Sequence, residues 1–200
     1  MGMSLPPTAD RRRWTADEAR ALQDESRAWP RYECIDGELL VTPGPRPAHY
    51  YAQMGLYERV RTYVHSQRLG EPYVPPTDVT LAPDTTIQPD LYVVPGWPPR
   101  RLRAWSEITA LLLAVEVLSP STARYDRLVK RRFLARVGVP ELWIVDLDAR
   151  LVERSWPDGR VDVLDERLEW RPAGAAEPFV LDLPAYFTDV LGDDPPPHTP

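Results

Sequence analysis

Residues 111–118 read Leu-Leu-Leu-Ala-Val-Glu-Val-Leu, and this stretch decides the fold class. A short, nearly continuous apolar run is typical of a strand that is buried on both faces of a sheet between helices. Glu116 interrupts the run. An isolated ionised carboxylate in a buried strand is costly, so we expect Glu116 to be paired, protonated or bound to a metal ion. The alternative is a glutamate at the strand end that reaches solvent or an arginine.

Helices and strands alternate on both sides of this run. Helices are expected at about 16–28, 48–68, from Ser121 or Thr122 to near Gly138, and at 186–191, and Gly70 is a candidate stop after the second. Strands are expected at 79–81, 87–94, 111–118, 141–146 and 179–183, with hairpins over 32–41 and 151–164 around Asp36-Gly37 and Asp158-Gly159. This order predicts an α/β fold with a mixed sheet flanked by helices.

The chain has 200 residues, a length that suits one domain with a real core. We expect this domain over residues 14–191, between a disordered N-terminus (1–13) and a disordered, proline-rich tail (192–200). The single cysteine, Cys34, cannot form an internal disulfide, which favours a reducing, cytoplasmic setting. No signal peptide is apparent, and the apolar stretch 108–118 is too short to span a bilayer, so no membrane partner is expected.

Basic residues are distributed unevenly. The net charge is −6, yet residues 100–136 carry nine basic and three acidic side chains, a local charge of +6. This pattern fits an enzyme that touches phosphates at one face, or equally a solvated, arginine-rich helix. Of the 24 basic residues only Lys130 is a lysine. Because lysine is a compact charge with a tunable pKa, a lone lysine in an arginine-rich chain can mark a place where arginine cannot substitute.

Three residues are candidates for chemistry. Asp90 precedes the apolar residues 91–94, as Glu116 lies in its own apolar run, so the two acids are expected at neighbouring strand ends, where they could share a divalent cation such as Mg²⁺. Lys130 lies fourteen residues after Glu116 on the third predicted helix, four residues after Asp126, and could reach the acids from there. The alternative for Asp90 is an acid that merely marks a turn, and the alternative for Lys130 is a surface pair with Asp126. We expect Lys130→Ala to change stability little, because a solvent-facing pair contributes little.

The sequence resembles the Uma-two family of endonucleases, which belongs to the PD-(D/E)XK nuclease superfamily. The resemblance runs over about residues 15–165 and rests on six blocks. These are 32–39 (Tyr-Glu-Cys-Ile-Asp-Gly-Glu-Leu), 47–49 (Pro-Ala-His), 88–91 (Gln-Pro-Asp-Leu), 115–122 (Val-Glu-Val-Leu-Ser-Pro-Ser-Thr), 125–127 (Tyr-Asp-Arg) with Lys130, and 138–146 (Gly-Val-Pro-Glu-Leu-Trp-Ile-Val-Asp). It implies a restriction-endonuclease-like mixed sheet flanked by helices, with an added N-terminal helix and hairpins.

The resemblance also implies roles. Asp90 would match the Asp of the Pro-Asp motif and Glu116 the acid of the (D/E)XK motif, and both would bind Mg²⁺ or Mn²⁺. The motif's lysine should fall two residues after Glu116, but Leu118 stands there. The resemblance implies that in this family the lysine has moved to the following helix, where Lys130 matches it. Glu33 would complete the acidic site, or would be a hairpin-edge acid. His49 shares a helix face with Gln53 and is more often a structural hydrogen-bonding residue than a base.

Together these features predict a metal-dependent endonuclease that hydrolyses phosphodiester bonds in DNA, with a homodimer left open. Lys130 would orient the attacking water or stabilise transition-state charge, and arginines of the 100–136 window could hold the DNA backbone. Two alternatives stay open. One is a catalytically weak or inactive nuclease-fold module that binds nucleic acid or protein, which the acidic net charge and the broken motif favour. The other is a soluble domain of different activity with structural acids.

Overall fold

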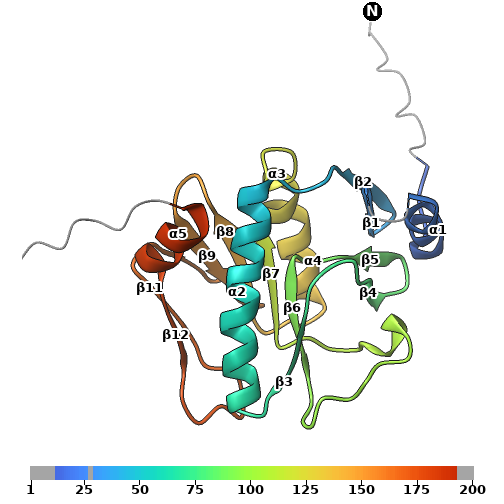
Figure 1. Cartoon of the computed structure of the whole chain (residues 1–200). Coiled ribbons are helices and arrows are strands. Elements are labelled where there is room, and N and C mark those ends of the chain that lie inside the picture. The colour runs from blue at the N-terminus through green and yellow to red at the C-terminus, as the bar shows by residue number, and fades with distance from the viewer. Residues whose placement is uncertain (1–11, 27–28, 193–200) are drawn as a thin grey trace, which may run out of the picture.

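The protein, described here by a computed structural model over residues 12–26 and 29–192, is a mixed α/β domain (Figure 1). Its helical elements are α1 (Ala16–Ser26), α2 (Pro47–Ser66), η1 (Trp105–Glu107), α3 (Ala123–Tyr125), η2 (Asp126–Lys130), α4 (Arg131–Arg136) and α5 (Leu183–Leu191). Its strands are β1 (Arg31–Ile35), β2 (Glu38–Thr42), β3 (Gly70–Tyr73), β4 (Val79–Ala82), β5 (Thr85–Ile87), β6 (Leu91–Pro95), β7 (Leu113–Val117), β8 (Leu142–Asp146), β9 (Leu151–Ser155), β10 (Val161–Leu164), β11 (Arg167–Trp170) and β12 (Phe179–Asp182).

The six-stranded sheet in the order β10-β9-β8-β7-β6-β3 is the centre of the described fold. Strand β7, which lies within the apolar run 111–118, is buried at all five positions. It pairs in parallel with β8 and antiparallel with β6. Parallel neighbours need a crossover connection, and the helical segment from α3 through η2 to α4 supplies it. The predicted mixed sheet flanked by helices is confirmed.

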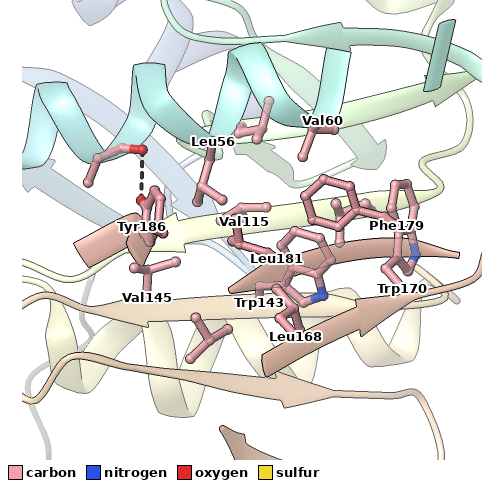
Figure 2. Close-up of a cluster of buried hydrophobic side chains, with 14 of the residues drawn as sticks. Leu56, Val60, Val115, Trp143, Val145, Leu168, Trp170, Phe179, Leu181 and Tyr186 are labelled. Atoms are coloured by element: carbon pink, nitrogen blue, oxygen red, sulfur yellow. Dashed lines mark hydrogen bonds between the residues drawn. The ribbon is translucent and has the colours of Figure 1, made fainter. Parts of the chain in front are cut away.

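Alternation along β7 divides the core between the two faces of this sheet. Val115 and Val117 pack with α2 and α5 in one cluster, while Ala114 packs with Phe133 of α4 in a second cluster. Figure 2 shows the first cluster, where α2 is joined to α5 by the Tyr186 hydroxyl, which donates to the carbonyl of Ala52 at 2.8 Å. Glu116 therefore faces the side of the sheet that the α3–α4 segment covers.

The smaller, four-stranded sheet, β2-β1-β5-β4, lies with α1 at one side of the molecule (Figure 1). The expected hairpin forms it in part: β1 and β2 pair antiparallel around Asp36 and Gly37, both at positive φ. The expected single strand over 87–94 is wrong. Strand β5 ends at Ile87 in the smaller sheet, and β6 starts at Leu91 in the larger one. Residues 88–90 join the two sheets, because Pro89 has no N–H to donate to a ladder.

Other elements depart from the expectations. The stretches β3 and β11 were not expected as strands, and β11 pairs with β12 in a separate two-stranded sheet. Gly70 is not a helix stop: α2 ends at Ser66, and a Cβ at Gly70 would lie 2.0 Å from the carbonyl oxygen of Val94. Glycine is required there because β3 runs very close to the end of β6.

The two expected disordered ends lie almost wholly outside the described residues. Three residues of these expected ends are described. Arg12 pairs with Glu18, Arg13 donates to the carbonyl of Asp36, and Gly192 is the C-cap of α5. The same limits apply to the last two residues of the helix expected at 16–28. Within residues 12–26 and 29–192, no helix combines the length and the apolar character that crossing a bilayer requires.

Candidate active site

Asp90 and Glu116 lie on neighbouring strands and on the same face of the large sheet. In the β6–β7 register Leu91 is opposite Val115, so continuation by one residue sets Asp90 opposite Glu116. Side chains of directly opposed residues in an antiparallel pair point to the same face. The backbone N–H of Val117 donates to Oδ2 of Asp90 at 2.9 Å, which holds the carboxylate beside β7. Both side chains are buried, with 4% and 2% of their surface exposed.

Lys130 reaches this pair from the helical segment that covers the same face. Its Nζ lies 3.1 Å from Oε1 of Glu116 and 3.5 Å from Oδ1 of Asp126. Only 3% of Lys130 is exposed. The Asp126–Lys130 pair is therefore not a surface pair. The expected small loss of stability on removal of Lys130 rested on a solvent-facing ammonium, and that premise is wrong.

The helix contains a π-helical turn at this point, which the sequence did not predict. In η2 the N–H of Arg131 bonds to the carbonyl of Asp126, five residues back. Asp126 and Lys130, at the two ends of this turn, are both buried, while Arg127 and Leu128 between them are not. Single π-turns inside helices occur frequently at functional sites.

Glu33 joins the cluster from the smaller sheet. Its Oε1 lies 3.0 Å from Nζ of Lys130 and accepts a hydrogen bond from the N–H of Gln88 at 2.8 Å. Glu33 is 2% exposed, so it is not a hairpin-edge acid in contact with solvent. Because Glu33 comes from β1 and Gln88 from the linker before Asp90, this carboxylate connects both sheets to the lysine.

Arg31 and His49 hold the carboxylate of Asp90. Nη1 of Arg31 donates to Oδ1 at 2.9 Å, and Nε2 of His49 lies 3.0 Å from Oδ2. Gln53, one helical turn after His49, donates to the backbone carbonyl of Asp90. Burial alone would raise the pKa of Asp90, but the bond and charge of His49, with the charges of Arg31 and Lys130, bring that pKa well below its usual range. Asp90 is therefore ionised.

Three further groups of the cluster, Glu116, Asp126 and Lys130, have raised pKa values. Burial raises the pKa of Glu116 well above its usual value, and the neighbouring acids Asp126, Asp90 and Glu33 add to this against the opposing charge of Lys130. Burial also raises the pKa of Asp126. Burial would lower the pKa of Lys130, but the surrounding carboxylates, led by Glu116, raise it well above the usual value, so the ammonium stays charged.

These groups line a cavity of about 920 Å³. Its wall is formed by Trp29 and Arg31, by residues 42–46 before α2, and by the segments that follow β7 (118–123) and β8 (146–150). Because β7 and β8 are parallel, both of these segments lie at the same edge of the sheet. The cavity gives a substrate a route to the cluster.

The basic window 100–136 does not form one free cationic surface. Arg127 lines the cavity, but it is paired with Asp146 and Glu153. Arg131 is also paired with Glu153, and Arg136 is paired with Asp36. For these three arginines, acids from other elements of the fold supply the partners.

A divalent cation fits the chemistry of the donor set. Among the described residues, no three His, Cys, Asp or Glu side chains are arranged to enclose a metal ion. Mg²⁺, however, is usually held by one or two carboxylates and keeps water and substrate phosphate as its remaining ligands. Asp90 and Glu116 supply two such carboxylates in one cavity, and buried Oδ1 of Asp126 has no hydrogen-bond partner. Added positive charge is favourable there, because the site holds more acids than permanent cations. The acids are Glu33, Asp90, Glu116 and Asp126, and the cations are Arg31 and Lys130.

Arg31 is the site residue that the sequence reasoning missed. It lies two positions before Glu33 on β1, and residues at i and i+2 of a strand share a face. That alternation was available from the sequence, but the proximity of β1 to Asp90 was not, because it depends on the pairing of β1 with β5. The positions of His49 and Gln53 agree with the shared helix face expected for them.

Comparisons with known proteins identify the family and the fold. The model of the Uma2 family, described as "Putative restriction endonuclease", matches residues 16–178. The fold is similar to a crystal structure from Anabaena variabilis titled as "a putative nuclease belonging to DUF820", with a TM-score of 0.68 and 23% identity, over 80% of this chain and 92% of that one. At this identity the likeness concerns the fold. No curated protein matches the chain. With most of its length matched by the family model, the chain belongs to the Uma2 family of restriction-endonuclease-like proteins.

Proposed function

We propose that this protein is a metal-dependent endonuclease that hydrolyses phosphodiester bonds in DNA. The observation that carries the proposal is the position of the Lys130 ammonium, buried within 3.1 Å of Glu116 and Glu33 in a cavity that Asp90 also lines. An ionised acid, an acid of raised pKa and a charged lysine within one cavity are typical of sites for acid, base and charge-stabilising work.

The residues divide the work by their surroundings. Asp90 and Glu116 would hold Mg²⁺ or Mn²⁺, which when bound supplies a polarised phosphate and an activated water. Lys130 orients that water or stabilises charge on the phosphate in the transition state, since its ammonium is already desolvated and fixed. Glu33 positions Lys130 through the 3.0 Å ion pair. Arg31 and His49 keep Asp90 ionised and fix the direction of its carboxylate.

The test is nicking of supercoiled plasmid DNA by the whole chain with Mg²⁺, with Mn²⁺ and with EDTA. We expect nicking only with a divalent cation. Glu116→Gln and Lys130→Arg should abolish or strongly reduce it, because an amide binds metal weakly and a guanidinium cannot occupy the position of the ammonium. Arg136→Met, a change at an exposed ion pair on the same helical segment, is the matched control and should nick like the parent. Nicking by Glu116→Gln at the parental rate would refute the assignment.

A second function is favoured by a specific observation. Both carboxylate oxygens of Asp90 already have protein partners, and Glu116 is already paired with Lys130, so each of the two proposed metal ligands is held by the protein itself. A nuclease-fold module that binds nucleic acid or protein without cleaving it would need no more than this. Titration calorimetry with Mn²⁺ separates the two: binding that Glu116→Gln abolishes supports the enzyme, and no heat in the parent supports the module.

Two further expectations belong to this proposal. A cytoplasmic setting is supported by Cys34, which is a buried free thiol. A homodimer stays a prediction, and sedimentation velocity of the whole chain tests it.

A further inference from the structure

The reacting groups of the proposed nuclease are recessed. Glu33, Asp90, Glu116 and Lys130 are each at most 4% exposed, so a scissile phosphate has to enter the cavity to touch them. A volume of about 920 Å³ lies at the upper end of the range of pockets, roughly 300–1,000 Å³, that enclose small ligands. This space suits a short piece of one strand.

A duplex does not readily present a phosphate in this way. A recessed site admits one flexible strand more easily than the wider duplex, just as enzymes that act on stacked bases use single strands or take the nucleotide out of the stack. Proteins that grip duplex DNA through its backbone commonly neutralise about 6–10 phosphates. Here the net charge is −6, and Arg31 and Arg127, two of the arginines that line the cavity, are held by carboxylates. Part of the arginine charge at the cavity is therefore already neutralised by the protein and is not available to phosphates.

An aromatic side chain stands at the cavity instead. Trp29 lines it and is 39% exposed, and the guanidinium carbon of Arg31 lies 4.5 Å from the centroid of its ring. A Cβ at Gly44 would be 3.6 Å from the indole, an ordinary contact, so Gly44 also lies near the ring. A partly exposed indole supported by a guanidinium offers stacking area. Bases of single strands stack on such side chains whatever their sequence.

We propose that the cavity takes a single polynucleotide strand in preference to an intact duplex, and that Trp29 stacks on a base of that strand. The inference rests on the proposed nuclease function and adds its substrate class. Arg31 links the two parts of the site, because it packs on Trp29 and also bonds to Asp90 at 2.9 Å. A base stacked on the indole would therefore lie next to the acids that face the scissile phosphate.

The chain contains a matched control for Trp29. Trp97 is 42% exposed, close to the value for Trp29, but it packs edge-on against His65 and does not line this cavity. Loss of an exposed indole is therefore the same in Trp29→Ala and Trp97→Ala, and only the first removes an aromatic surface from the cavity.

The experiment measures binding apart from cleavage. Fluorescence anisotropy of labelled single-stranded DNA, single-stranded RNA and duplex DNA of equal length is recorded with the whole chain in Ca²⁺. We expect tighter binding of the single strands than of the duplex. Trp29→Ala should weaken single-strand binding by about 5- to 150-fold, the loss of one base–aromatic stack. Trp29→Phe should retain most of the affinity, Trp97→Ala all of it, and thermal melting should confirm that each variant is folded.

Each outcome bears on the inference. Equal or tighter binding of the duplex, equal effects of Trp29→Ala and Trp97→Ala, or no binding of any probe would overturn it. A difference between the DNA and RNA strands identifies the sugar that the site prefers. Cleavage with Mn²⁺ is scored separately. Selective binding of single strands without any cleavage would refute the nuclease function and keep this inference. Cleavage of a duplex that binds as tightly as a single strand would support the nuclease function and overturn this inference.

Discussion

Replacing Lys130 by methionine is the most informative perturbation of the proposed site. The methionine has nearly the same length and no charge, so it leaves Glu33, Glu116 and Asp126 buried without their shared cation. Their oxygens lie 3.0 to 3.5 Å from Nζ. Unit charges 4 Å apart attract by about 4 kcal/mol at an effective dielectric constant near 20, and desolvation offsets much of the sum of such attractions.

The expected net loss is therefore that of breaking a buried ion pair, about 3–5 kcal/mol. This is a large part of the total stability of a domain, about 5–15 kcal/mol. The measurement is urea unfolding followed by tryptophan fluorescence, with the midpoint and slope compared between parent and variant. Arg136→Met is the matched control: its partner Asp36 and the arginine are both more than half exposed, so its midpoint should change little.

The loss should also depend on pH. Burial raises the pKa values of Glu116 and Asp126 in the folded protein, and without the ammonium they rise further. An acid whose pKa is raised by folding binds its proton more tightly in the folded state than in the unfolded state. At low pH it is protonated in both states and its burial costs no stability from ionisation. As the pH rises above the usual carboxyl range, the acid destabilises the folded state increasingly. Lys130→Met should therefore lose more stability at pH 8 than at pH 5. The double variant with Glu116→Gln should recover part of the loss. If Lys130→Met unfolds at the same urea concentration as Arg136→Met, the lysine is solvated and the whole site geometry is wrong.

Three further predictions concern other parts of the molecule. Millimolar Mn²⁺ should raise the melting temperature of the parent by mass action but not that of Glu116→Gln, and an equal shift in both would place the ion elsewhere. Tyr186→Phe should cost about 0.5–1.5 kcal/mol of unfolding free energy, because it removes the hydrogen bond to Ala52 that joins α5 to α2 (Figure 2), and an unchanged urea midpoint would contradict this. Gly70→Ala should lower the melting temperature, since its Cβ would overlap the backbone of Val94; unaltered melting would show that β3 can move away.

Much of the fold follows from local patterns that act over a few residues. The apolar run around Val115 predicted a buried strand, and the Asp36-Gly37 pair predicted a hairpin, because burial on both faces and positive φ each restrict the residue types allowed. The strand predicted through Pro89 was wrong for the opposite reason. Whether an apolar stretch continues in one sheet or passes between two depends on the partners of each half, and these lie far away in the chain.

For the candidate site, too, local sequence patterns predicted some features and distant partners decided the others. The sequence by itself determined that Glu116, in its apolar strand, is costly to bury without a partner, and that Lys130 is the one lysine of an arginine-rich chain. Only the tertiary structure decided that Lys130 is buried among three carboxylates, since the helical segment packs onto the sheet that carries Glu116 and Glu33 comes from another sheet. Arg31 became part of the site in the same way. Local chemistry is encoded by residue type, but the field around each charge is set by neighbours that the chain brings together only on folding.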